Sequence, residues 1–183
     1  MFSIFSRLLL KKLTILGLVI LALSSLSGCQ EDLLPSDHPL EPSAQSRVGT
    51  TLDDVAFTLS DGQQQSLSGR LQQSDAFVLY FTMWCPVCDL HMSHIRDTFL
   101  SAYPSVEFVF VDYVSGTVAI SEQSRTSSGY RDFNVIADVD NSLEQLFGAT
   151  MASTVVIDKN FIVLFQEEFK DGIRLTEILD ALQ

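Results

Sequence analysis

The sequence predicts an α/β domain with a mixed central sheet, helices on both faces of the sheet and an N-terminal β-hairpin. Three observations support this fold class. Apolar runs typical of buried strands alternate with segments of helical periodicity, and hairpin signals stand near both ends of this region. In addition, 46% of the 183 residues are hydrophobic and only 19% are charged, which favours a buried core over disorder.

The first half of the predicted domain contains a hairpin and two buried strands with a helix between them. Val55–Leu59 and Gln65–Leu67 flank Asp61-Gly62, a turn signal typical of a β-hairpin. The apolar run Ala76–Thr82 predicts a central strand, and Val106–Val111 predicts a second one. Between these strands, a helix is predicted from apolar residues at three- to five-residue steps, namely Val87, Leu90, Ile95, Phe99 and Ala102.

The second half continues the alternation of strands and helices. A short helix is predicted around Val118–Arg125, a short strand at Phe133–Ala137 and a helix at Asn141–Phe147. Two strands at Thr154–Ile157 and Phe161–Phe165 would form a hairpin with an antiparallel edge. A closing helix is predicted, with an apolar face made of Ile173, Ile178, Leu179 and Leu182.

Residues 1–28 resemble a bacterial lipoprotein signal peptide. Three basic residues precede the apolar segment Leu13–Leu26, which is shorter than the roughly 20 residues of a membrane span. The basic residues are Arg7, Lys11 and Lys12. The segment leads into Ser27-Gly28-Cys29, which resembles a lipoprotein box and implies cleavage before Cys29 and acylation of that residue. An uncleaved anchor, or a secretory signal followed by a chance cysteine, is the alternative.

Residues 29–47 are predicted to form a flexible tether, and residues 48–183 the folded domain. The tether contains three prolines and four acidic residues without sustained periodicity. Gln30 follows Cys29, and the sorting rule of Gram-negative bacteria would then direct the lipoprotein to the outer membrane, facing the periplasm. The lipid on Cys29 would supply the attachment to the membrane.

The charge balance limits the range of partners. Eleven Lys and Arg against 23 Asp and Glu give a formal net charge of −12. A nucleic-acid-binding protein needs a basic surface for the phosphates, so this class is excluded. The same acidic field repels anionic lipid surfaces, which leaves the lipid as the means of membrane attachment.

Trp84-Cys85-Pro86-Val87-Cys88 is the motif that carries the chemistry. It follows the first central strand at the start of a helix, so Cys85 would lie where free N–H groups and the helix dipole stabilise a thiolate. Pro86 suits the first helical turn, since its missing N–H would be unpaired there. We predict Cys85 to be the exposed nucleophile and Cys88, one turn later, to be the covered resolving thiol of a redox disulfide.

These residues together resemble the thioredoxin fold, and within it the exported redoxin-family proteins related to cytochrome c maturation thioredoxins. The resemblance covers roughly Val48–Leu182 and is most specific at Phe81–Cys88. It implies a thiol-disulfide oxidoreductase that exchanges electrons with protein thiols or disulfides and with a redox donor, and that needs no cofactor. It also implies that Trp84 covers the disulfide and contacts partners, with core packing as the alternative.

The sequence departs from this family at three places. Members usually have a cis-proline in a loop that docks substrate and keeps metals off the cysteines, whereas this chain has Met151-Ala152-Ser153, where a trans peptide is expected. Leu79 stands where classical thioredoxins have a buried acid. His91 stands where cytochrome-maturation relatives have a glutamate, which makes it a candidate proton acceptor for Cys88. A partly exposed histidine without a role is the alternative.

Two other functions remain open from the sequence. Cys85, Cys88 and His91 form a Cys-x2-Cys-x2-His pattern suited to copper or zinc, although no fourth ligand is evident. A thiol peroxidase would use the same nucleophile, and Thr82 stands three residues before Cys85, as in peroxiredoxins. However, Val78 replaces their proline, and the sequence does not place an arginine at the thiolate. The direction of electron flow is not determined by the sequence.

Overall fold

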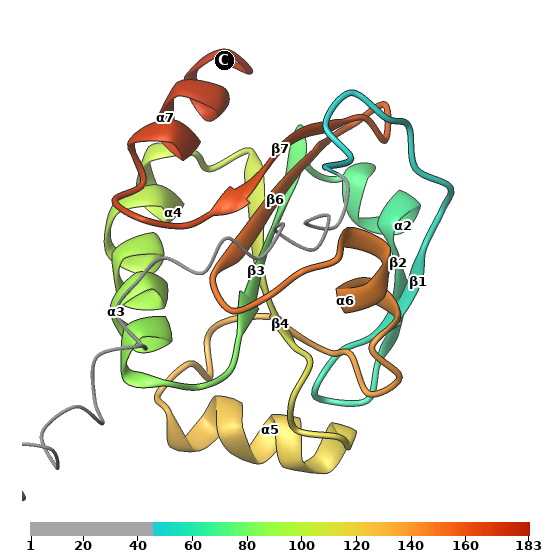
Figure 1. Ribbon diagram of the computed structural model, residues 1–183, viewed down its shortest axis with the longest axis vertical. Coiled ribbons are helices and arrows are strands. Elements are labelled where there is room, and N and C mark those ends of the chain that lie inside the picture. The colour runs from blue at the N-terminus through green and yellow to red at the C-terminus, as the bar shows by residue number, and fades with distance from the viewer. Residues whose placement is uncertain (1–45) are drawn as a thin grey trace, which may run out of the picture. The chain divides into compact units, whose positions relative to one another are not determined.

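The computed structural model describes residues 46–183, and the statements below refer to that part of the chain (Figure 1). The predicted signal peptide, the acylation site Cys29 and most of the predicted tether lie outside it. At the end of the predicted tether, the Arg47 Nε donates to the Leu146 carbonyl at 2.6 Å, and the Arg47 N–H donates to Gln166 Oε1 at 2.9 Å. Within residues 46–183, no helix combines the length and the hydropathy that crossing a membrane requires.

A five-stranded mixed sheet forms the centre of the fold, with the strand order β5-β4-β3-β6-β7. The strands are β3 (Ala76–Thr82), β4 (Val106–Asp112), β5 (Val135–Ala137), β6 (Ser153–Asp158) and β7 (Val163–Glu168). The first three are parallel to one another, while β6 runs antiparallel to β3 and β7 antiparallel to β6. This confirms the prediction of alternating strands and helices followed by an antiparallel edge.

Helices cover both faces of the sheet, as predicted. A continuous helical run leads from β3 to β4 and consists of α3 (Pro86–His94), the π-helical turn η2 (Ile95–Phe99) and α4 (Leu100–Ala102). The other helices are α5 (Val118–Ser127), α6 (Ser142–Phe147) and α7 (Ile173–Asp180). In Figure 1, α3 and α4 lie on one side of the sheet and α6 lies on the other.

The N-terminal hairpin forms a small sheet of its own. Its strands are β1 (Ala56–Thr58) and β2 (Gln64–Ser66), which pair antiparallel around the predicted turn. The short helix α2 (Leu67–Leu71) follows directly and was not predicted. The Ser66 hydroxyl caps this helix by accepting a hydrogen bond from the Gly69 N–H at 3.2 Å.

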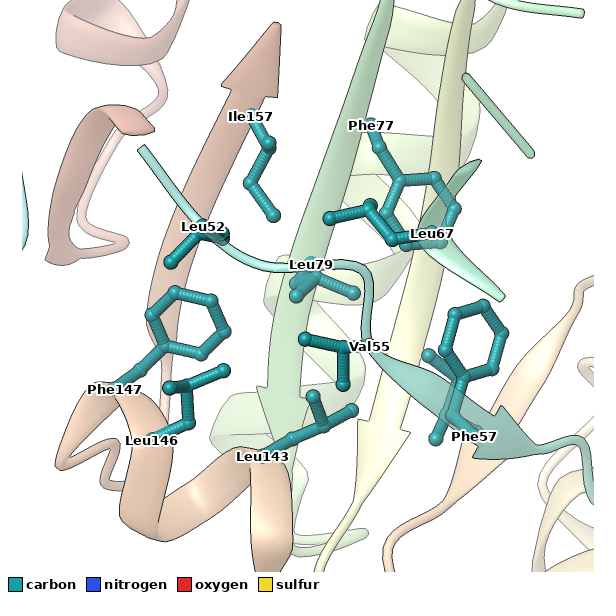
Figure 2. Close-up of a pocket in the computed structure, with 11 residues that line it drawn as sticks. Leu52, Val55, Phe57, Leu67, Phe77, Leu79, Leu143, Leu146, Phe147 and Ile157 are labelled. Atoms are coloured by element: carbon teal, nitrogen blue, oxygen red, sulfur yellow. The ribbon is translucent and has the colours of Figure 1, made fainter. Parts of the chain in front are cut away.

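Strand β3 is buried on both faces and therefore contributes to two cores. Val78 and Tyr80 point into the core formed with α3 and α7, while Phe77, Leu79 and Phe81 point into the core under the hairpin and α6. In Figure 2, side chains from the hairpin region and from α6 surround Leu79. The cavity between them holds only about 10 Å³, so it is a packing defect and not a ligand site.

One predicted strand starts later than expected. The sequence predicts a strand from Phe161, but β7 starts at Val163. The carboxylate of Asp158 accepts hydrogen bonds from the backbone N–H groups of Asn160 at 2.9 Å and Ile162 at 2.8 Å. These bonds lengthen the turn, and Phe161 adopts a left-handed φ of 65° within it.

The apolar face of the last helix also differs from the prediction. Ile173 is 60% exposed, whereas Leu175 and Leu179 are buried. Ile178 and Leu182 pack against the same core, as predicted. Because an α-helix has about 3.6 residues per turn, Leu175 lies one turn before Leu179 on the buried face, and Ile173 points away from it.

Candidate active site

The two cysteines lie at the junction between β3 and α3. Cys85 is the N-cap residue of α3, and its sulfur accepts a hydrogen bond from the Cys88 backbone N–H at 3.2 Å. Pro86 occupies the first turn, where its missing N–H costs no helical hydrogen bond. The helix N-terminus thus favours negative charge on the Cys85 sulfur.

The two sulfur atoms are close together but differ in exposure. The Sγ atoms of Cys85 and Cys88 are 2.6 Å apart, and both residues are free cysteines. Cys88 is fully buried, whereas Cys85 is partly exposed. A small movement closes a disulfide bond of about 2.05 Å. Of the two sulfurs, only that of Cys85 is within reach of another molecule.

The surroundings of Cys88 stabilise its thiolate. Burial raises the pKa of the Cys88 thiol, but hydrogen bonds from the Cys85 thiol, from the backbone and from the Thr82 hydroxyl lower this pKa by more. The backbone groups involved are those of Met83 and Cys85. The net shift of the Cys88 pKa is downward, so the interior of the site can hold a negative charge shared by the two sulfurs.

Tyr80 is a site residue that the sequence analysis missed. Its hydroxyl lies 3.0 Å from Nδ1 of His91 and also hydrogen-bonds to Cys88. Burial, followed by the charges of Cys88 and Cys85, raises the pKa of Tyr80 far above its usual range. The hydroxyl therefore stays protonated. A tyrosine inside an apolar strand gives no sequence signal beyond core packing, which explains why its contact with the thiol was not predicted.

His91 reaches Cys88 through Tyr80. Its ring packs against Phe169 at a centroid distance of 5.0 Å and edge-on against Tyr80 at 6.0 Å. Burial lowers the pKa of His91, with an opposing effect from Glu168 and a further lowering by His94. The imidazole is thus favoured in its neutral form, in which Nδ1 can accept a proton.

The lowered pKa of His91 should make the fold acid-sensitive. The unfolded chain binds this proton at a pKa of about 6.5, whereas the folded chain binds it only at lower pH. The free energy of unfolding should be unaffected well above about pH 6.5 and should fall as the pH drops below it. Urea unfolding near pH 7.5 and 5.5 measures this loss. The loss should be smaller in His91→Gln than in the wild type, and an equal loss in the two proteins would contradict the prediction.

The loop before β6 faces the dithiol. Met151 Sδ lies 3.5 Å from Cys85 Sγ. The Ala152 N–H donates to the Phe81 carbonyl at 3.0 Å, and the Ala152 carbonyl accepts from the Phe169 N–H at 2.8 Å. No peptide bond within residues 46–183 is cis, and Ala152 has a left-handed φ of 68°. Two backbone hydrogen bonds therefore hold the loop at Ala152.

Ser153 stabilises this loop through a hydrogen bond of its side chain and does not act on the cysteine sulfurs directly. As the first residue of β6, it accepts a hydrogen bond from the Thr150 N–H on its hydroxyl at 2.9 Å. This bond closes the turn that precedes the strand, so Ser153 shapes the loop that carries Met151.

An open groove of about 380 Å³ adjoins the exposed cysteine. Its lining residues are Trp84, Cys85, Pro86, Asp89, Met92 and Ser128. Trp84 packs against Tyr130 at a ring distance of 6.4 Å, and its buried Nε1 has no hydrogen-bond partner among residues 46–183. The Tyr130 hydroxyl in turn donates to Asp89 Oδ1 at 2.6 Å. Trp84 thus combines core packing with a position beside the nucleophile, as both interpretations of the sequence allowed.

The alternative ligand set and the peroxidase features are not assembled around Cys85. Within residues 46–183, no three His, Cys, Asp or Glu side chains form a metal-binding group, so Cys85, Cys88 and His91 do not converge. The Thr82 hydroxyl hydrogen-bonds to Cys88 and accepts from the Trp84 N–H at 3.1 Å. The Arg125 guanidinium is bound to Glu122 and to the backbone carbonyls of Arg131 and Phe133, so its charge is already paired by a carboxylate.

Comparison with known proteins finds similar folds at low sequence identity. No protein-family model matches the chain, and no curated protein matches its sequence. Among solved structures, a Chlorobium tepidum protein named thiol:disulfide interchange protein DsbE has 19% identity and a TM-score of 0.62, over 75% of this chain and 98% of that one. Peroxidoxin BcpB from Mycobacterium tuberculosis has 22% identity and a TM-score of 0.59, over 75% and 96% of the two chains.

A third similar structure is a secreted Mycobacterium tuberculosis disulfide oxidoreductase that is homologous to DsbE of E. coli. It has 18% identity and a TM-score of 0.54, over 69% of this chain and 95% of that one. The three structures share their overall fold with this chain at TM-scores of 0.54 to 0.62. The described part of this chain therefore has the thioredoxin-like fold.

Proposed function

We propose that this protein is a thiol-disulfide oxidoreductase that exchanges electrons with protein thiols and disulfides through Cys85 and Cys88. The observation that supports this best is the pair of sulfurs 2.6 Å apart at the N-terminus of α3, one reachable and one buried. Thiol-disulfide exchange needs no further group, because the electrons move within the bonds that form and break.

The exchange would begin at Cys85. Its thiolate attacks a disulfide of the partner protein, forming a mixed disulfide while the first partner sulfur leaves as a thiolate. The Cys88 thiolate then attacks Cys85 Sγ, closing the internal disulfide and releasing the second partner sulfur. Two electrons pass from this protein to the partner, and the reverse sequence oxidises a partner dithiol. The open groove beside Cys85 is where a partner segment would lie.

Tyr80 and His91 would accept the proton that the Cys88 thiol releases. The Cys88 thiol gives its proton to the Tyr80 oxygen while the Tyr80 proton moves to His91 Nδ1, 3.0 Å away. In this scheme His91 is a positioning residue that acts through Tyr80. Tyr80 and His91 would thus take the place of the buried acid of classical thioredoxins as proton acceptor, since the corresponding residue here is the apolar Leu79.

Removal of the Tyr80 hydroxyl should therefore slow the resolving step. In Tyr80→Phe we expect the pKa of the Cys88 thiol to rise and the rate of Cys88 attack to fall by about tenfold or more at neutral pH. The rate is measured by thiol release from a glutathione mixed disulfide at Cys85, across a range of pH. Tyr103→Phe is the matched control, since its hydroxyl donates to Asp180 at 2.7 Å. Identical pH profiles in both variants would exclude the role of Tyr80.

The reduction potential tests the proposed function as a whole. The full chain carrying Cys29→Ser, purified in detergent, is equilibrated with glutathione or dithiothreitol buffers and alkylated for mass measurement. We expect a reversible two-electron transition of Cys85 and Cys88. A midpoint near about −270 mV would indicate a reductant, and one near about −120 mV an oxidant. Failure to form the Cys85–Cys88 disulfide would overturn the proposal.

We further propose that the protein is lipid-anchored through Cys29 in the outer membrane and faces the periplasm. The lipoprotein box and Gln30 support this location. The periplasm is an oxidising compartment in which protein disulfides form, so it contains substrates for disulfide exchange. In a Gram-negative host, labelled palmitate should be incorporated into the wild type and not into Cys29→Ser. An unlabelled wild type, or one in the soluble fraction, would contradict the anchor without affecting the redox proposal.

A further inference from the structure

We propose that the reduced protein binds one Cu(I) ion through the sulfurs of Cys85, Cys88 and Met151. Cys85 Sγ lies 2.6 Å from Cys88 Sγ and 3.5 Å from Met151 Sδ. Met151 comes from the loop before β6, 66 residues away from Cys85 in the sequence. The fold thus brings a thioether to a dithiol, with the Cys85 sulfur close to both of the other sulfurs.

The type of ligand favours Cu(I) over other biological metals. Thiolate and thioether sulfurs are soft ligands, and Cu(I) prefers them. Zinc normally takes four ligands, and within residues 46–183 no imidazole or carboxylate joins the two cysteines in a metal-binding group. The His91 imidazole has its Nδ1 3.0 Å from the Tyr80 hydroxyl. The site that remains has three soft ligands and no hard one.

The spacing of the sulfurs is close to what such a site needs. With metal–sulfur bonds of about 2.3 Å, as in zinc thiolates, three ligands in a plane are separated by about 4 Å. The Cys85–Met151 distance is already near this value. The Cys88 sulfur would have to move away from Cys85 by about 1.4 Å, which is within the range of a side-chain rotation.

The backbone holds Met151 in place over the dithiol. The next residue, Ala152, is tied to Phe81 and Phe169 by backbone hydrogen bonds of 3.0 and 2.8 Å. The Met151 side chain is partly buried and packs against the core under α3. In contrast, Met83 is 45% exposed, although it stands only two residues before Cys85 in the sequence. The net charge of −12 additionally favours cations over anions.

Binding would require no electron transfer. The two thiols release their protons, the two thiolates and the thioether bind the metal, and copper remains Cu(I) throughout. Both thiolates are then occupied and cannot attack a disulfide, so the copper form and the disulfide form exclude each other. The inference rests on the same reduced dithiol as the proposed function, but it does not depend on exchange with a partner protein.

Copper binding is tested on the full chain carrying Cys29→Ser, reduced and purified without oxygen. Titration with Cu(I) against bicinchoninate should give one ion per chain, and X-ray absorption should show three sulfur ligands. Met151→Leu should weaken the affinity for Cu(I) by at least about tenfold, because even residues that only support metal ligands contribute that much. The X-ray absorption of this variant should show two sulfur ligands on the copper. Met83→Leu is the matched control and should change neither value.

Three results would overturn the copper site. These are equal affinity in the wild type and in Met151→Leu, two sulfur ligands in the wild type itself, or more than one ion per chain. The X-ray absorption of the wild type keeps the test valid even if Met151→Leu folds poorly. Normal disulfide formation together with any of these results would reject only the copper site. Failure to form the disulfide would reject the proposed function instead.

Discussion

Cys85→Ser should abolish disulfide exchange, with a loss of at least about a thousandfold in rate, because a hydroxyl is not ionised where a thiolate is. Cys85 is the N-cap of α3 and is the sulfur within reach of a partner, so no other group can make the first attack. The rate is measured by the reduction of a glutathione mixed disulfide or of a protein disulfide under excess dithiothreitol. Circular dichroism before and after the substitution checks that the fold is retained.

Cys88→Ser is the matched variant and should behave differently. Cys85 can still attack a disulfide, but the buried residue at position 88 can no longer release the partner. We expect a stable mixed disulfide, seen as a mass increase by one partner molecule. If Cys88→Ser turned over normally while Cys85→Ser formed a trapped complex, the two cysteines would have the opposite roles.

Ala152→Pro should lower the free energy of unfolding by about 3 kcal/mol or more. The φ of Ala152 is 68°, whereas a proline ring requires about −65°. Proline also removes the N–H that donates to the Phe81 carbonyl at 3.0 Å, inside a buried part of the structure. Thus the residue type that the family usually has at this loop should be unfavourable in this chain.

Urea denaturation measures the change in stability caused by Ala152→Pro. Ala152→Gly is the control, because glycine adopts a left-handed φ freely, and its stability should stay within about 1 kcal/mol of the wild type. If Ala152→Pro were as stable as the wild type, the loop conformation at Ala152 would not be the one described above, and the contact of Met151 with Cys85 would have to be measured again.

The strand, the helix start and the exposed cysteine could be predicted from the sequence because they depend on neighbouring residues. The apolar run Ala76–Thr82 can be buried only as a central strand, and its predicted bounds agree with β3. Pro86 suits the first turn of a helix, which makes the preceding Cys85 its N-cap. Local patterns were less specific where several faces of a helix had similar apolar periodicity. Ile173 is an example, since it was predicted on the apolar face of the last helix but is exposed.

The groups around the sulfurs could not be predicted in this way. The sequence showed that Leu79 provides no buried acid and made His91 a candidate proton acceptor, but it did not show that Tyr80 would contact both His91 and Cys88. It showed a loop without proline, but not that Met151 lies 3.5 Å from Cys85. The first contact depends on how α3 packs on β3, and the second on the loop that leads into β6, which pairs with β3.

The sequence by itself therefore determined the fold class, the position of the dithiol and the residue types absent from its surroundings. Hydrophobic periodicity, capping and turn preferences act over a few residues, and these suffice for such features. Only the tertiary structure decided which side chains meet at the two sulfurs. Contacts between residues such as Cys85 and Met151, 66 positions apart, depend on strand order and on the backbone conformation at Ala152, and no local pattern encodes either.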